Sequence, residues 1–89
     1  MQNFLSHKEA SEARMEENLD HDFAKRIKTA RLVQAFSVQD AAKAIGVSVP
    51  TYRRYEAGHT KHLRVNKIVK IAIDLRCSPA YLIGFTEDM

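Results

Sequence analysis

Residues 36–58 read FSVQDAAKAIGVSVPTYRRYEAG, and this stretch decides the expected fold. Its first half predicts a short helix beginning after Ser37, because serine is a favourable N-cap and Asp40, three residues later, supports that cap. Apolar side chains then recur at i, i+3, i+4 and i+7 on one helical face: Val38, Ala41, Ala42 and Ile45. Gly46 is expected to end this helix with a positive φ.

The second half of the stretch predicts another short helix. Ser48 is its expected N-cap, Pro50 lies in the first turn, where a missing N–H is tolerated, and Gly58 ends it. Tyr52 and Tyr55 are three residues apart and are expected to face inward. Two helices joined by a tight turn containing glycine are typical of domains that place the second helix in the DNA major groove.

Apolar periodicity extends the helical pattern on both sides of this stretch. In a helix that begins near Asp20 or Asp22, the apolar positions are Phe23, Ile27 and Ala30. In a helix that follows a polar, basic loop, they are Ile68, Ile71, Ala72 and Leu75. Ser78 and Pro79 predict the start of a short last helix, which Gly84 closes. Nothing alternates with period two for long enough to predict a strand, so the expected fold is an all-α bundle of five helices.

Charge divides the chain unevenly. Residues 1–22 hold two basic and six acidic residues, a net charge of −4, whereas the other residues hold 12 basic and five acidic ones, a net charge of +7. We interpret residues 1–20 as an acidic leader that is either an additional helix or disordered, residues 21–86 as the helical domain and residues 87–89 as a tail. The basic charge of the domain favours a polyanionic partner. The alternative interpretation is that these charges only keep the surface soluble.

Several functional classes are not expected for this chain. Its 89 residues suit one small domain, and no apolar run approaches the length of about 18 residues that a membrane span needs. The single cysteine, Cys77, cannot form an internal disulfide, which favours a reducing cytoplasm. His59 and His62 fall short of a four-ligand metal site. No catalytic set and no phosphate-binding glycine loop is present, so neither an enzyme nor a cofactor is expected.

Three motifs together point to a known family. They are the Gly46-Val47-Ser48 turn, the Glu56-Ala57-Gly58 helix end and the segment Ser78-Pro79-Ala80-Tyr81-Leu82. With these motifs, residues 23 to about 85 resemble the lambda-repressor/Cro-type helix-turn-helix domain, also called the xenobiotic-response-element family. Three positions depart from the family pattern: Val38 replaces a polar residue, Ala57 an asparagine and Leu63 a proline.

The resemblance implies that the helix after Ser48 is the recognition helix. Val49, Pro50 and Arg54 match the base-facing positions of the family, with Arg53 next to them. An arginine fork can bind guanine O6 and N7 together, whereas the valine and proline can only pack against a thymine methyl group. A solvated basic face is the plainer interpretation of the two arginines.

The resemblance also implies contacts to the DNA backbone and one structural ion pair. The expected phosphate contacts are Ser48, Thr51, Lys61 and His62. Lys61 is the foremost of these, because a cation at a phosphate displaces counterions. Thr51 is equally suited to stabilising the start of its own helix. Arg31 and Glu56 match a partly buried family ion pair that orients the recognition helix.

A sequence-specific regulator of transcription is the function that the resemblance implies. It would be a cytoplasmic repressor, encoded by a prokaryote or a phage, that binds a palindromic operator in double-stranded DNA as a dimer. The apolar residues suited to a dimer patch are Tyr81, Ile83, Phe85 and Met89, and the leader is the other candidate. The alternative function is an antitoxin that binds a toxin, with the leader as the protein-binding segment, and represses its own operon.

Overall fold

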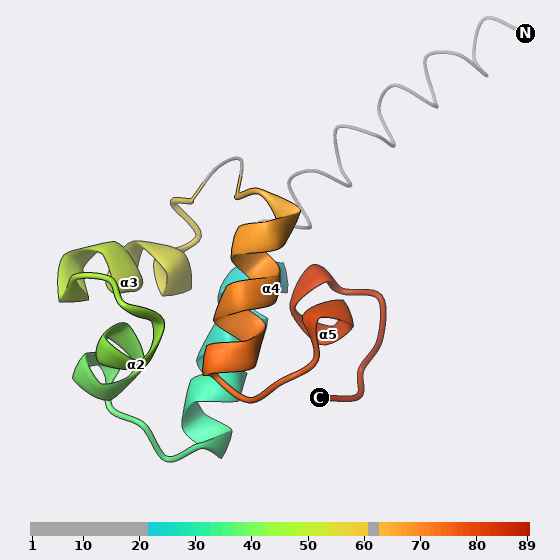
Figure 1. Ribbon diagram of the computed structural model, residues 1–89, viewed down its shortest axis with the longest axis horizontal. Coiled ribbons are helices and arrows are strands. Elements are labelled where there is room, and N and C mark those ends of the chain that lie inside the picture. Colours follow the sequence, from blue (N-terminus) through green and yellow to red (C-terminus); the bar gives the residue numbers. More distant parts are fainter. Residues whose placement is uncertain (1–21, 61–62) are drawn as a thin grey trace, which may run out of the picture.

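The computed structural model describes residues 22–60 and 63–89, and every regular element in these two ranges is a helix (Figure 1). The first helix covers residues 22–33. It is followed by α2 (Val38–Ile45), α3 (Val49–Ala57), α4 (Val65–Asp74) and α5 (Pro79–Ile83). The expected all-α bundle of five helices is confirmed. The predicted leader at residues 1–20, the alternative cap Asp20, Lys61 and His62 lie outside the described residues.

Local capping sets the ends of α2 and α3 as the sequence predicts. The Ser37 side chain accepts from the Asp40 backbone N–H, and the Asp40 carboxylate accepts from the Ser37 backbone N–H, both at 3.0 Å. The bond from the Ser37 backbone is the main reason that the pKa of the Asp40 carboxyl lies below its ordinary value. Gly46 and Gly58 end the two helices in the left-handed region, with φ of 75° and 78°. The turn between α2 and α3 is therefore fixed at both ends by short-range interactions.

Two other helix ends use the left-handed conformation without a glycine. Ala35, after the first helix, has φ of 58°, and Arg76, after α4, has φ of 59°. The Phe36 backbone N–H donates to the Arg31 carbonyl at 3.1 Å, which closes the first helix in the pattern that usually recruits glycine. A Cβ in this conformation costs about 1–2 kcal/mol.

The core forms where the first helix, α2, α3 and α4 meet and α5 closes one side. Its largest fully buried side chains are Tyr52, Ile27, Ile71, Leu75 and Leu82. Helix α2 contributes Ala41 and Ala42, which are completely covered. Because these side chains are small, α3 and α4 can both approach α2 closely.

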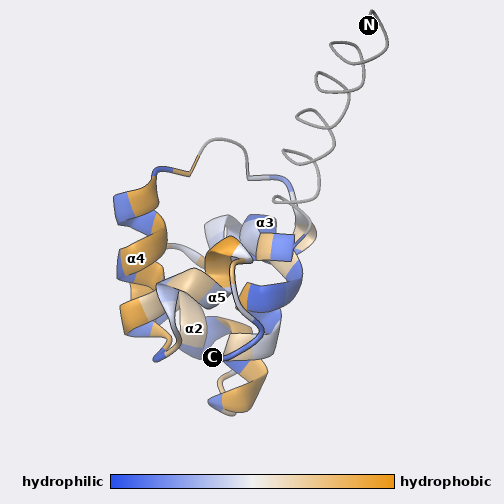
Figure 2. Cartoon of the chain, turned by 90° about the vertical axis from the view of Figure 1, so that its right-hand side faces the viewer, coloured by the Kyte–Doolittle hydropathy of each residue, from blue (hydrophilic) through white to orange (hydrophobic). Residues whose placement is uncertain are grey.

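Helix α4 is covered on one side only. Ile71 and Ala72 are buried, whereas Val65 and Ile73 expose about two thirds of their surface, 66% and 65%. Figure 2 shows apolar and polar segments interleaved along this helix. The sequence pattern therefore identifies the buried side of α4 correctly, and the other side faces solvent.

Arg26 fastens the C-terminal residues to the first helix. Its guanidinium donates to the backbone carbonyls of Tyr81 at 3.0 Å and Thr86 at 2.6 Å, and it pairs with the Glu87 carboxylate at 2.8 Å. The same group lies over the Tyr81 ring, 4.6 Å from its centroid, in a cation–π contact. The sequence pattern places Arg26 only off the apolar face of its helix and gives no sign of these contacts.

The contribution of Tyr81 to an apolar dimer patch is a prediction that the structure contradicts. Tyr81 is only 6% exposed, because its ring packs in the core under the Arg26 guanidinium. Phe85 and Met89 remain exposed and Ile83 is half-buried. The Met89 carbonyl accepts from the Ser78 backbone N–H at 2.7 Å, so the last residue lies at the start of α5.

Candidate functional site

Helix α3 turns one face to the core and the other to solvent. Tyr52 and Tyr55 are buried, as the sequence predicts. Their rings pack edge to face, with 6.3 Å between centroids. The expected DNA-facing residues of this helix are all exposed or half-buried: Val49, Pro50, Thr51, Arg53 and Arg54. The outer face of α3 thus carries Pro50, Thr51, Arg53 and Arg54. Val49 is half-buried and packs partly against the core, so only part of its side chain is accessible.

Arg53 and Arg54 are both exposed cations. Neither forms a salt bridge with a carboxylate among residues 22–60 and 63–89. An arginine without a carboxylate partner keeps its planar set of donors available for an external acceptor. This face of α3 is therefore chemically suited to bidentate recognition of a base edge or a phosphate.

The start of α3 is held by a pair of hydroxyl groups. The Ser48 side chain accepts from the Thr51 backbone N–H at 3.3 Å and donates to the Thr51 hydroxyl at 2.9 Å. The Ser48 hydroxyl is used at the helix start, which leaves its backbone N–H for the expected phosphate contact, while Thr51 retains its own hydroxyl proton for an external acceptor. The role of Thr51 at the start of its own helix is thus observed, and its expected contact with a phosphate stays a prediction.

Arg31 and Glu56 come together as an ion pair between the first helix and the last turn of α3. Two guanidinium nitrogens of Arg31 donate to the two Glu56 carboxylate oxygens, at 2.6 and 3.1 Å, and a third bond of 3.0 Å reaches the Phe36 carbonyl. Both side chains are largely covered, with exposures of 12% and 13%. The hydrogen bonds that Arg31 donates to Glu56 are the main cause that raises the pKa of Arg31. Paired in this way, the two residues fix the end of α3 relative to the first helix.

Tyr52 lies beside this ion pair, and its hydroxyl is buried without a hydrogen-bond partner in the described part of the chain. Burial is the main cause that raises the pKa of Tyr52, and the nearby Glu56 carboxylate adds to the effect. The phenol is therefore neutral at physiological pH. Its ring contributes to the packing of α3, and its oxygen is not available to an external ligand.

The loop after α3 is described only in part. His59 is exposed. Because Lys61 and His62 lie outside the described residues, their expected contacts with the DNA backbone stay predictions. Across residues 22–60 and 63–89, no cluster of three or more His, Cys, Asp or Glu side chains could hold a metal ion.

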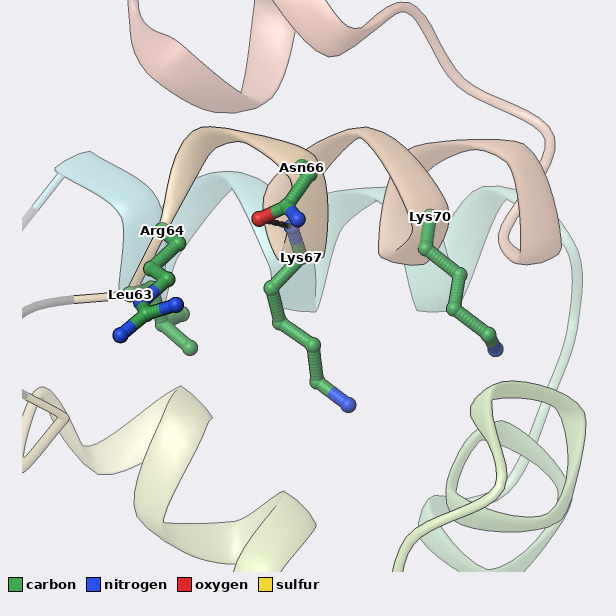
Figure 3. A pocket seen from close by; sticks show the side chains of 5 residues that line it. All are labelled: Leu63, Arg64, Asn66, Lys67 and Lys70. Atoms are coloured by element: carbon green, nitrogen blue, oxygen red, sulfur yellow. Dashed lines mark hydrogen bonds between the residues drawn. The ribbon is translucent and has the colours of Figure 1, made fainter.

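A basic groove along α4 is a feature that the motifs do not identify. It has a volume of about 460 Å³ and is lined by Leu63, Arg64, Asn66, Lys67 and Lys70; we call it the α4 groove. The cationic side chains leave α4 on the side that faces α2 and α3 (Figure 3). The spacing of three residues between Arg64, Lys67 and Lys70 is the sequence signal for this feature, because it places all three along one side of a helix.

Comparison with known proteins agrees with this architecture. The family model described as helix-turn-helix, HTH_3, matches residues 27–82. The crystal structure of an HTH_3 family transcriptional regulator from Vibrio cholerae aligns with a TM-score of 0.67 and 22% sequence identity, over 75% of this chain and 37% of that one. The chain thus spans little more than a third of that regulator. No curated protein matches the sequence. In the described ranges, none of the helices has the length and apolar character needed to traverse a bilayer.

Proposed function

The chain belongs to the helix-turn-helix family HTH_3, and we propose that it regulates transcription by binding double-stranded DNA with α3 in the major groove. The observation that carries this proposal is the outer face of α3. Two adjacent arginines lie there without carboxylate partners in the described ranges, while the Arg31–Glu56 pair holds the helix from behind. The solved regulator from Vibrio cholerae supports the fold on which this proposal depends.

Sequence readout would come from the residues on that face. Arg54, with Arg53 beside it, would bind a guanine edge, and Val49 and Pro50 would pack against a thymine methyl group. Ser48 and Thr51 at the start of α3, and Lys61 and His62 after it, would contact phosphates and fix the register. These roles require no cofactor and no catalytic step.

We further propose that the protein acts as a dimer that represses transcription from a palindromic operator in the cytoplasm of a prokaryote. One recognition helix contacts few base pairs, so a second copy is needed for useful specificity. Two-fold dimers of this kind bind half-sites about 34 Å apart. Of the residues expected to form the dimer patch, Phe85 and Met89 are exposed and Ile83 is half-buried, so these three remain the candidates for the contact.

Selection of bound sequences from random duplex DNA tests this function. The full-length chain is expected to enrich one motif with two-fold symmetry and half-sites spaced by about one helical turn. Sedimentation of the protein with the enriched duplex then gives the number of chains per site. Failure to enrich any sequence at low ionic strength would contradict DNA binding, and an enriched site without symmetry would contradict only the dimer.

A further inference from the structure

We propose that the α4 groove is the docking site of this chain's own acidic leader, residues 1–20. The groove supplies cations and a partly buried leucine, and the leader supplies carboxylates and scattered apolar residues. Docking needs no DNA and stands apart from the proposed function. Its consequence for DNA binding, given below, rests on that function.

The groove carries positive charge that its surroundings do not neutralise. Within residues 22–60 and 63–89, Arg64 and Lys67 form no salt bridge, and Lys70 pairs only with Asp74, four residues on, at 2.7 Å. The Lys70 side chain keeps 59% of its surface exposed, so this pair is a surface contact that an incoming carboxylate can replace. Leu63 packs partly into the core and gives the groove an apolar end. The groove is therefore suited to an acidic peptide with some apolar side chains.

The leader has the matching composition. Residues 1–20 hold five acidic and two basic residues, a net charge of −3. Four of the acidic residues fall within nine positions: Glu9, Glu12, Glu16 and Glu17. Its larger apolar residues include Phe4, Leu5, Met15 and Leu19. Opposite charge on one short chain makes the leader the best-matched occupant that the sequence offers.

The attachment point places the leader within reach. The described chain begins at residue 22, at the end of the bundle where α4 also begins (Figures 1 and 2). Twenty residues span up to about 66 Å when extended, whereas two turns of α4 span about 11 Å. A tethered segment also acts at an effective concentration in the millimolar range, which favours it over a separate molecule.

Docking would oppose DNA binding. The α4 groove opens toward α2 and α3 (Figure 3), so a docked leader would bring several carboxylates beside the proposed recognition helix. These carboxylates would repel the DNA phosphates and would pair with the basic side chains of the groove, which DNA could otherwise contact. DNA would have to displace the leader, and its measured affinity would be lower by that cost.

Paramagnetic broadening in the full-length chain, without DNA, tests the docking. A nitroxide is attached at Ser11→Cys in a Cys77→Ala background, and amide signals are compared with those of the reduced label. We expect selective broadening at Asn66, Lys67 and Lys70 at low salt, with none at Leu32 or Val33 at the other end of the first helix. Broadening that is absent from the groove would overturn the proposal.

Matched charge variants assign the contact to the groove. Lys67→Gln with Lys70→Gln should abolish the selective broadening, whereas Lys25→Gln with Lys28→Gln, which removes two exposed lysines from the first helix, should preserve it. Equal effects of both pairs would overturn the site. Broadening of equal strength in a mixture of spin-labelled and isotope-labelled chains would show docking between copies and would overturn docking within one chain.

A DNA titration tests the competition separately. Replacing Glu9, Glu12, Glu16 and Glu17 by glutamine should tighten binding to duplex about tenfold at low salt, and the gain should vanish near 0.5 M salt. Equal affinity at low salt would contradict the competition. The double variant in the groove, Lys67→Gln with Lys70→Gln, is compared with the double variant on the first helix, Lys25→Gln with Lys28→Gln. If the groove variant binds duplex more weakly, the groove contacts DNA and the docking proposal is overturned. If no chain binds any duplex, the proposed function fails while the broadening still decides the docking.

Discussion

Arg31 and Arg54 are the same residue type placed in opposite environments. Arg31 lies on the inner side of the first helix, where its fork matches both oxygens of Glu56. Arg54 lies on the outer face of α3 with no salt bridge among the described residues. The first guanidinium is committed to the fold and the second is available to a partner. The difference follows from which side of a helix each residue occupies.

Replacing Glu56 by glutamine should destabilise the fold. The change leaves the Arg31 guanidinium largely covered and without its counter-charge, which should cost about 2–3 kcal/mol. Urea denaturation followed by circular dichroism gives the free energy of unfolding. The double variant Arg31→Met with Glu56→Leu, which removes both charges, should recover much of the loss. A loss below about 0.5 kcal/mol in the single variant would mean that the pair contributes little.

Replacing Arg54 by alanine should reduce sequence discrimination. If Arg54 binds a guanine edge, its loss should weaken binding to the selected site by about 1–3 kcal/mol and affect random duplex much less. Fluorescence anisotropy with both duplexes measures the two effects. Lys43→Ala, which removes an exposed cation from α2, is the charge control. Equal losses on the two duplexes would reduce Arg54 to a general phosphate contact.

At the scale of the helices, the ends of α2, α3 and α5 are predictable because their signals are short-range. A serine cap precedes each of these helices and a glycine with positive φ follows each. Such signals involve residues within four positions of each other, so sequence spacing alone reveals them. The ends at Ala35 and Arg76 lack this signal, because neither residue is the glycine that usually marks a left-handed helix end.

The capping box of α2 should give the protein an acid-sensitive component of stability. The pKa of Asp40 is lowered in the folded chain, so its contribution is complete above the ordinary value of 3.8 and is lost as pH falls through the lowered pKa. Asp40→Asn keeps a polar side chain that does not titrate. The difference in thermal midpoint between native and variant chains should therefore shrink below pH 3.8. A difference that is constant from pH 6 to 2 would contradict this assignment.

Glycine at position 35 should stabilise the protein. Ala35→Gly removes the strain of a Cβ at φ of 58°, and this gain exceeds the extra backbone entropy of glycine, leaving about 0.5–1 kcal/mol. Ala44→Gly is the matched control, because Ala44 is exposed inside α2, where glycine should cost up to about 1 kcal/mol. Chemical denaturation compares the two. A loss of stability in both variants would show that Ala35 is not strained.

At the scale of the whole molecule, the features that cannot be predicted from the sequence are contacts between residues far apart along the chain. Ion pairing of Arg31 with Glu56 joins residues 25 positions apart and is foreseen only through the family resemblance. Arg26 reaches the carbonyl of Thr86, 60 positions away, and no local pattern predicts that contact. Tyr81 is likewise buried through long-range packing that includes the Arg26 guanidinium over its ring. The helices and the outer face of α3 are thus readable from spacing, whereas tertiary anchors are not.

Cys77 should report on the opening of the whole fold. The thiol is buried, and this burial raises its pKa, so both access and thiolate content are low in the native chain. An aromatic disulfide reagent at pH 8 should react about 100-fold more slowly with the native protein than with the chain in guanidinium. Adding the selected duplex should slow the reaction further. Equal rates in native and denatured samples would mean that the contact between α4 and α5 opens freely.

The Arg26 anchor has a consequence for how the domain comes apart. The Arg26 guanidinium connects the first helix to Thr86 and Glu87, so the chain between these residues forms a loop closed by non-covalent bonds. Local unfolding of the first helix or of the C-terminal residues would break the three hydrogen bonds of Arg26 and its cation–π contact with Tyr81 together. The two extremities should therefore melt together with the centre, and amide protons near Phe85, whose N–H donates to Ala80, should exchange as slowly as those of the interior.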